Sequence, residues 1–133
     1  MKHGDLCHVE IPTSSVENAR RFYGGLFGWT FAELPGKPPY TIFRTSKGGV
    51  GGGLWNPPPG APRHVTNYVL VRSLDEAVEK VTELGGRVCT DRMEVPGWGS
   101  FRIVTDPDQN SFGLWEAAAR KPAPGRKSPR KRR

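Results

Sequence analysis

The sequence predicts an α+β fold in which two tandem βαβββ units form one curved, cup-like mixed sheet with the helices outside. Two observations carry this prediction. The segments at 16–28 and 74–86 resemble each other, and each is followed, after two further strand-like runs, by the tripeptide Gly-Leu-Trp, at 53–55 and 113–115. Similarity at a fixed spacing is typical of a repeated structural unit. Two such units can bury their leftover sheet faces by joining their sheets.

The first unit begins with LCHVEI at 6–11, which alternates as a strand. His8 and Glu10 fall on one face of it, expected to face the cup, whereas Cys7 falls on the opposite face. Ser14 followed by Glu17 matches a capping box and predicts the start of a helix. The helix and the three strands that follow it are expected at 16–28, 29–34, 40–46 and 49–55.

The second unit repeats this order. VTNYVLV at 65–71 is a strand pattern, and Ser73 followed by Glu76 matches a second capping box. The apolar residues of the next segment recur at helical spacing until Gly85 ends the pattern. The helix and its three following strands are expected at 74–86, 87–92, 100–105 and 111–116.

Charge and proline content divide the chain into one domain at 1–118 and a tail at 119–133. Within the domain, the units at 6–55 and 65–116 are joined by a proline-rich linker at 56–64. The formal net charge is +7, but eight of the 20 Lys and Arg residues lie in the last fourteen positions, which hold no acid. The rest is nearly neutral, which excludes a generally basic nucleic-acid-binding domain. The tail is expected to be disordered and to make at most weak contact with polyanions.

The sequence indicates a cytoplasmic protein without a membrane segment. No apolar run approaches the roughly 20 residues that a membrane helix needs, and the N-terminus leads into a strand pattern without a signal peptide. Cys7 and Cys89 lie far apart in strand-like runs, so buried free thiols are expected. A structural zinc site would need close pairs of ligands, which the sequence lacks.

Three segments carry a resemblance to a known family. HVEIPTSSVENARRFYGGLFGW (8–29), LDEAVEKVTELGG (74–86) and DPDQNSFGLWE (106–116) resemble the vicinal oxygen chelate superfamily, which includes glyoxalase I, bleomycin-resistance proteins and extradiol dioxygenases. The resemblance covers residues 6–116 and implies the cup-shaped fold. It does not define the reaction, because the superfamily hosts many chemistries on one scaffold.

The resemblance also implies where a metal would bind. Enzymes of the superfamily usually hold a divalent metal through one ligand on the first and one on the last strand of each unit. On the first strands these positions match His8 and Thr66, and on the last strands Gly53 and Gly113 fall at or next to them, so His8 is the only matching ligand. Zinc, nickel and iron sites need at least three donor side chains. We therefore predict that the protein holds no metal and no other cofactor, the alternative being the family's divalent metal on irregular ligands.

Six side chains are candidates for binding a ligand in the cup. Four lie on the cup face of the first strand of each unit, one is an aromatic residue in a loop, and one lies on the strand that follows this loop. They are His8, Glu10, Thr66, Tyr68, Trp98 and Phe101. Of these, His8 and Glu10 are the candidates for catalysis. The alternatives are a structural role for His8, an ion pair of Glu10 with Arg44, and a loop-anchoring role for Trp98 instead of a lid.

The sequence therefore predicts a glyoxalase/bleomycin-resistance-like protein that binds a small amphipathic molecule without a metal. One alternative is an enzyme, a lyase, isomerase or dioxygenase, using an irregular metal site or metal-free acid–base chemistry. The other is a polyanion-associated module acting through the basic tail. A homodimer is expected, because family members often pair and the two units leave sheet edges to cover.

Overall fold

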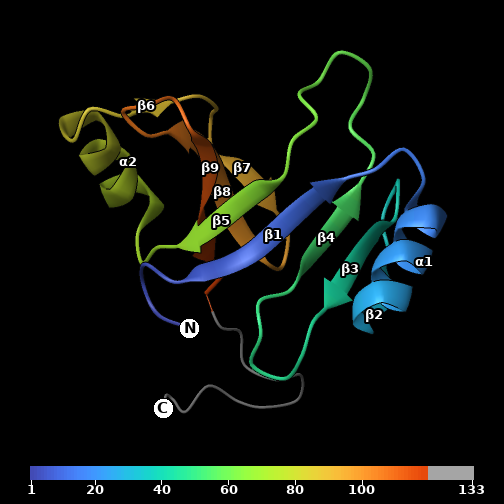
Figure 1. The fold of residues 1–133 in the computed structure, drawn as a ribbon. Coiled ribbons are helices and arrows are strands. Elements are labelled where there is room, and N and C mark those ends of the chain that lie inside the picture. The colour runs from blue at the N-terminus through green and yellow to red at the C-terminus, as the bar shows by residue number, and fades with distance from the viewer. Residues whose placement is uncertain (120–133) are drawn as a thin grey trace, which may run out of the picture.

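The computed structural model describes residues 1–119. These residues form nine strands in one mixed sheet and two helices. Figure 1 shows the sheet curved, with the helices at its opposite ends. The α+β cup predicted from the sequence is therefore confirmed. Apart from Ala119, the tail that we expect to be disordered and basic lies outside the described residues.

The first unit has the predicted order of elements. Its helix α1 is longer than three turns and is followed by three short strands. The bounds are β1 Leu6–Pro12, α1 Val16–Phe27, β2 Thr30–Leu34, β3 Tyr40–Arg44 and β4 Gly52–Trp55.

The second unit contains one strand more than the sequence pattern predicts. The bounds are β5 Thr66–Leu70, α2 Leu74–Glu83, β6 Arg87–Val88, β7 Met93–Val95, β8 Gly99–Thr105 and β9 Ser111–Ala117. The single strand expected at 87–92 is replaced by β6, whose pairing ends early because the Thr90 hydroxyl accepts from the Ile103 amide. After this break, β7 pairs with the beginning of β8.

The two units meet through their first strands. The sheet order is β2-β3-β4-β1-β5-β9-β8-β6, with β7 paired to β8. In each unit the first strand runs parallel to the last, β1 with β4 and β5 with β9, whereas β1 and β5 pair antiparallel. The units are thus joined into one continuous sheet along β1 and β5 (Figure 1).

Serine side chains cap both helices. Ser73 Oγ accepts from the Glu76 amide at 3.2 Å, as predicted. In the first unit, however, Ser15 and not Ser14 is the N-cap, with its Oγ 3.1 Å from the Asn18 nitrogen. The shift arises because Ser15 is the last residue with extended backbone before the helix. Neither helix is long and apolar enough to cross a bilayer within residues 1–119.

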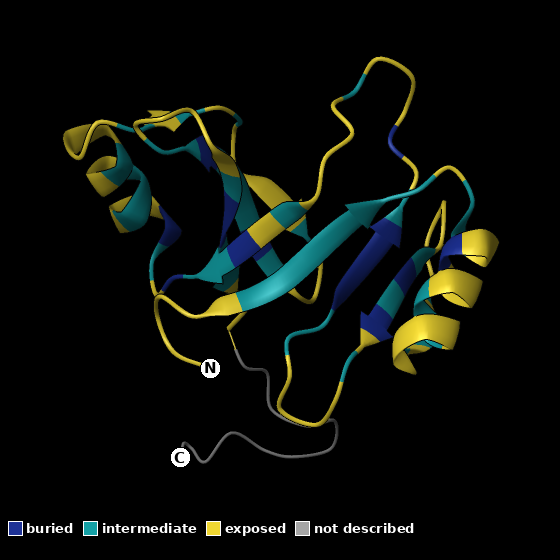
Figure 2. Cartoon of the chain, in the orientation of Figure 1, coloured by how far each residue is buried: buried dark blue, intermediate teal, exposed yellow. Residues whose placement is uncertain are grey.

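Each helix covers its own half of the sheet. Under α2, the buried cluster consists of Val71, Leu74, Val104 and Leu114. Under α1, it consists of Ala19, Phe43 and Leu54. Figure 2 shows β4 as largely buried and the outward faces of both helices as exposed. The cysteines depart from the expected burial, since Cys7 is half-buried and Cys89 is exposed.

We expect that Leu74→Ala destabilises the fold strongly. Leu74 is fully buried at the start of α2, and truncating a buried leucine costs about 2–5 kcal/mol. Leu84→Ala, at the other end of the same helix, is the matched control, because Leu84 is 75% exposed and should cost about 0.5 kcal/mol or less. Urea unfolding followed by circular dichroism measures both. Equal losses would show that Leu74 does not belong to the core.

Candidate functional site

The concave face of the sheet forms a groove of about 2030 Å³ to which both units contribute. This is larger than the roughly 300–1,000 Å³ of most small-molecule sites. All six candidate residues of the sequence line it, together with a tyrosine that the sequence did not single out. They are His8, Glu10, Tyr40, Thr66, Tyr68, Trp98 and Phe101. The surface of the groove therefore brings together side chains from β1, β3, β5, β8 and the turn before β8.

Four of these side chains form a hydrogen-bonded group, here called the Glu10 cluster: His8, Glu10, Tyr40 and Tyr68. The Tyr40 hydroxyl donates to Glu10 Oε2 at 2.9 Å, and the Tyr68 hydroxyl donates to Glu10 Oε1 at 3.4 Å. The Nε2 atom of His8 lies 3.0 Å from the Tyr40 oxygen. Because Tyr40 gives its one proton to Glu10, its oxygen accepts from His8 Nε2–H.

Strand pairing explains why these side chains meet. His8 stands opposite Tyr68 in the antiparallel pairing of β1 with β5, and Glu10 stands opposite Thr66. Residues His8 and Glu10 share one face because side chains alternate along a strand. The His8 ring lies edge-to-face against the Tyr68 ring, with centroids 5.6 Å apart. The predicted cup face of β1 and β5 is therefore the face on which the Glu10 cluster forms.

Glu10 has no positively charged partner among residues 1–119. The ion pairs found in this part of the chain all involve Arg92, so the ion pair considered between Glu10 and Arg44 is not formed. Burial raises the pKa of the Glu10 carboxyl, and the hydrogen bonds from Tyr40 and Tyr68 offset part of this rise. Two neutral hydroxyls are thus the polar partners of this carboxylate.

The other members of the Glu10 cluster stay neutral near pH 7. Burial lowers the pKa of His8, so its imidazole remains uncharged at neutral pH. Burial, with the Glu10 charge as a further cause, raises the pKa of Tyr40 and of Tyr68 far above the neutral range. Both phenols therefore keep the protons that they donate to Glu10.

Two tyrosines fill the space that the family's metal ligands would need. A Cβ atom at Gly53 would collide with the Tyr40 hydroxyl, and one at Gly113 would collide with the Tyr68 ring. Within residues 1–119, no three His, Cys, Asp or Glu side chains are grouped closely enough to hold a metal ion. The residues present therefore do not fit the four-ligand site of the superfamily. Where ligands would converge, the chain has phenol rings.

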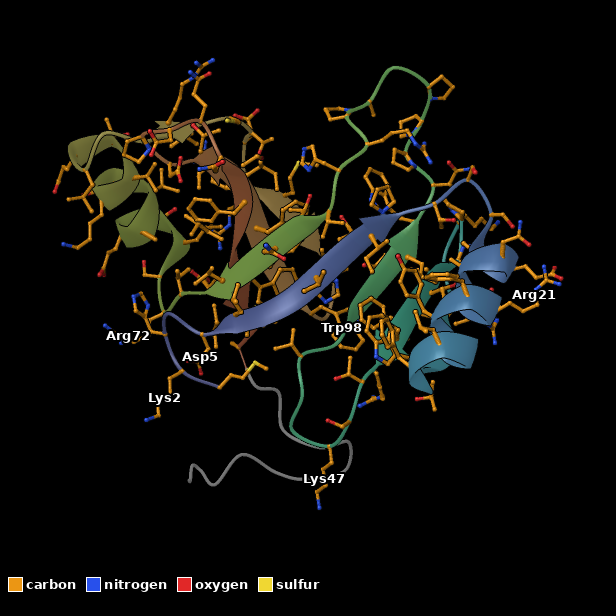
Figure 3. All side chains as sticks on the ribbon, in the orientation of Figure 1. Lys2, Asp5, Arg21, Lys47, Arg72 and Trp98 are labelled. Carbon is orange, nitrogen blue, oxygen red and sulfur yellow. The ribbon has the colours of Figure 1, made fainter. Side chains whose placement is uncertain are left out.

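Aromatic side chains form the wall of the groove in the second unit. The Phe101 ring lies edge-to-face against Tyr68 and is stacked with Trp115, at centroid distances of 5.6 and 6.3 Å. Trp98 is 58% exposed, and its backbone is tied to Val95 and Ala118 by hydrogen bonds of 2.9 and 2.8 Å. Figure 3 shows Trp98 between the two halves of the sheet in that view. An exposed indole on an anchored turn is available for contact with a bound molecule.

Thr66 lines the groove as expected, with its hydroxyl 3.5 Å from His64 Nδ1. The predicted placement of Cys7 needs correction. Cys7 lines the groove as well, although alternation puts it on the opposite face from His8. The physical reason is an irregularity between Leu6 and His8, where the register of β1 against β5 shifts and the alternation breaks.

Two groove residues, Tyr40 and Trp115, were not predicted from the sequence pattern. Tyr40 opens β3 and shares a face with Ile42 and Arg44, so period-two alternation places it on the groove side. A second signal is Gly53 on the adjacent strand, since a glycine in a sheet often marks the close approach of another group. Trp115 on β9 is half-buried and lines the groove.

The curved sheet built from paired units defines a class of protein. The chain belongs to the Glyoxalase/Bleomycin resistance protein/Dioxygenase superfamily, whose sequence model matches residues 6–114. The resemblance stated from the sequence is therefore confirmed.

Individual relatives agree with this membership. The chain is 30% identical over 115 residues to CFP32 of Mycobacterium tuberculosis, which bears a glyoxylase name. The match covers 82% of this chain and 44% of CFP32, so the chain spans less than half the length of that relative.

Solved structures share the fold at low sequence identity. A hypothetical protein from Bacillus halodurans is similar with a TM-score of 0.73 at 13% identity, over 91% of this chain and 99% of that one. The methylmalonyl-CoA epimerase of Mycobacterium tuberculosis is similar with a TM-score of 0.69 at 15% identity, over 87% of this chain and 89% of the epimerase. These likenesses concern the fold alone.

We expect Gly53→Ala to destabilise the protein by about 1–3 kcal/mol, because the added methyl displaces the Tyr40 ring. The cost should fall in a Tyr40→Ala background, where the space is free. Gly25→Ala is the control: Gly25 lies in α1 with nothing near its Cβ position, and alanine there should stabilise by about 0.5–1 kcal/mol. Chemical unfolding of the four variants measures the coupling, and strict additivity would contradict the Tyr40 contact.

Glu10 should make stability depend on pH. Its pKa is raised above the ordinary 4.5, so the folded state binds this proton more tightly than the unfolded state. The corresponding stability is fully present below pH 4.5 and is lost as pH rises through the folded pKa. In the Glu10→Gln variant this side chain cannot titrate. The free energy of unfolding of the native protein minus that of the variant should therefore decrease as the pH rises from about 4 towards neutrality. Urea unfolding across that range tests this, and a rise would contradict it.

Proposed function

We propose that the chain binds a small amphipathic molecule in the groove, in the manner of a glyoxalase/bleomycin-resistance-like protein, and does so without the family's metal. The observation that carries the proposal is the Glu10 cluster, a polar centre on a surface otherwise dominated by apolar side chains. A mostly apolar concave site with a few convergent polar groups is the usual form of a small-molecule site.

The two kinds of side chain have different tasks in this proposal. The aromatic wall of Phe101, Trp115 and Trp98 takes up the apolar body of the ligand, which is stabilised by burial of its surface. The Glu10 cluster orients the polar end through hydrogen bonds. A site of this form selects for a molecule that has both parts.

The metal-free part of the proposal rests on the donors at hand. Of the four positions that the family uses, His8 alone carries a good ligand, and Glu10 on the same strand is the nearest addition. Two donors from one strand fall short of the three that catalytic zinc and iron sites use. Tyr40 and Tyr68 occupy the space where replacements for the missing ligands would enter.

A second candidate function is metal-free acid–base catalysis, as in a lyase or isomerase. It is favoured by the chain of hydrogen bonds from His8 through Tyr40 to Glu10. It is also favoured by the raised pKa of the Glu10 carboxyl, because a general base works best when its pKa lies near the working pH. Catalysis would require a substrate proton within hydrogen-bond reach of the Glu10 oxygens. Turnover that Glu10→Gln abolishes, with substrate affinity retained, would distinguish the enzyme from the binding protein.

We also propose that the chain forms a homodimer. The described sheet ends in two edge strands, β2 and β6, and Phe22 and Leu26 are 60% exposed on α1. Edge strands and exposed apolar side chains are commonly covered by a partner. Light scattering of the purified protein tests this, and a strict monomer would contradict it.

Binding of 2-naphthylmethanol, a neutral amphipathic probe, tests the proposed function. Calorimetric titration should detect binding to the native protein, and Phe101→Ala should weaken it roughly tenfold through lost aromatic contact. Phe27→Ala removes an equal side chain that is 57% exposed at the end of α1, outside the groove lining, and should leave the affinity unchanged.

The same titration after treatment with a chelator tests the metal-free part. We expect equal affinity before and after treatment, and elemental analysis of the purified protein should find less than one metal ion per chain. Stoichiometric metal whose removal abolishes binding would contradict the proposal. No binding of the probe to any form would contradict the groove as a ligand site.

A further inference from the structure

We propose that the molecule bound in the groove is an amphipathic organic cation, an apolar ring system that carries an ammonium group, and that the ammonium binds to the Glu10 carboxylate. This inference rests on the proposed function and adds the chemical class of the ligand. Two observations support it: the hydrogen-bonding groups that the Glu10 cluster leaves free, and the positions of the positive charges around the groove.

The Glu10 cluster presents acceptors and has already used its donors. The Tyr40 and Tyr68 protons are directed to the two carboxylate oxygens of Glu10, and the His8 Nε2 proton is directed to Tyr40. An ionised carboxylate has about four acceptor sites, so one hydrogen bond to each oxygen leaves both oxygens able to accept another. A ligand group that donates hydrogen bonds fits here, whereas a ligand carboxylate would meet no free donor of the cluster.

Glu10 also lacks a compensating charge. Within residues 1–119 it forms no ion pair, and its partners are two neutral phenols. A partly buried carboxylate without a cation is costly, and that cost falls when a cation binds beside it. Burial raises the pKa of this carboxyl. Because Glu10 lines the groove, a ligand ammonium can reach it.

The aromatic wall suits the same ligand. Tyr68 and Phe101 meet edge-to-face beside the Glu10 cluster, and Trp115 follows behind Phe101. Aromatic faces attract an ammonium group within about 6 Å, and they also take up an apolar ring. The groove can therefore stabilise both parts of an aromatic amine.

The positive groups that line the groove are solvated. They are the exposed side chains of Arg44 and Lys47 and the exposed N-terminal residue Met1. Exposed charges interact weakly because water and salt screen them. They do not supply the desolvated contact that would hold an anionic ligand, and Figure 3 shows Lys47 at the tip of the loop between β3 and β4, remote from the middle of the sheet. The observations thus favour a cation over an anion.

Three probes with one ring system test the charge preference by calorimetric titration: 2-naphthylmethylamine, 2-naphthylmethanol and 2-naphthoic acid. At neutral pH we expect the amine to bind at least about tenfold more tightly than the alcohol, because its positive charge is attracted to the carboxylate and the alcohol carries no charge. The acid should bind most weakly.

Glu10→Gln keeps the size of the side chain and removes its charge. In this variant the preference for the amine over the alcohol should shrink to about threefold or less. Glu33→Gln is the matched control, because Glu33 is an exposed carboxylate on β2 outside the groove lining, and it should keep the native preference.

The outcomes separate this inference from the proposed function. If the alcohol binds and the amine binds no more tightly, or if the acid binds best, the groove remains a ligand site but the proposal of a cationic ligand is wrong. If none of the three probes binds, both proposals are wrong. The comparison among probes on the native protein decides the question even where Glu10→Gln fails to fold.

Discussion

The antiparallel pairing of β1 with β5 is the contact on which the rest of this structure depends. It joins the two units into one sheet, and the curvature of that sheet makes the groove. The same pairing sets His8 opposite Tyr68 and brings Glu10 within reach of the Tyr68 hydroxyl. A shift of one residue in this register would turn every side chain of β1 to the other face. The fold and the candidate site therefore share one physical determinant.

The exchange of metal ligands for glycine gives this groove its own chemistry. A glycine on the last strand of each unit leaves room for a phenol ring, supplied by Tyr40 in the first unit and by Tyr68 in the second. Both hydroxyls then converge on Glu10, so the described residues place a carboxylate with two phenol partners in the middle of the groove.

Particular residues show why the sequence predicted some features and missed others. Ser73 was recognisable as a cap because the cap and its partner lie three residues apart, and local spacing is visible in a sequence. Ser14 was chosen wrongly because two adjacent serines satisfy almost the same pattern. Tyr40 was missed because it lies thirty residues from Glu10 in the chain and reaches it only through the pairing of β3 with β4 and of β4 with β1.

Local sequence patterns predict the repeated units, the curved sheet, the two covering helices and the groove face of β1 and β5. These features follow from period and from internal similarity, which neighbouring residues encode. The three-dimensional structure is needed to show which groups surround Glu10, which side chains lie beside Gly53 and Gly113, and that Cys7 turns towards the groove. Contacts across strands depend on register and on irregularities such as the one after Leu6, and no local pattern records them.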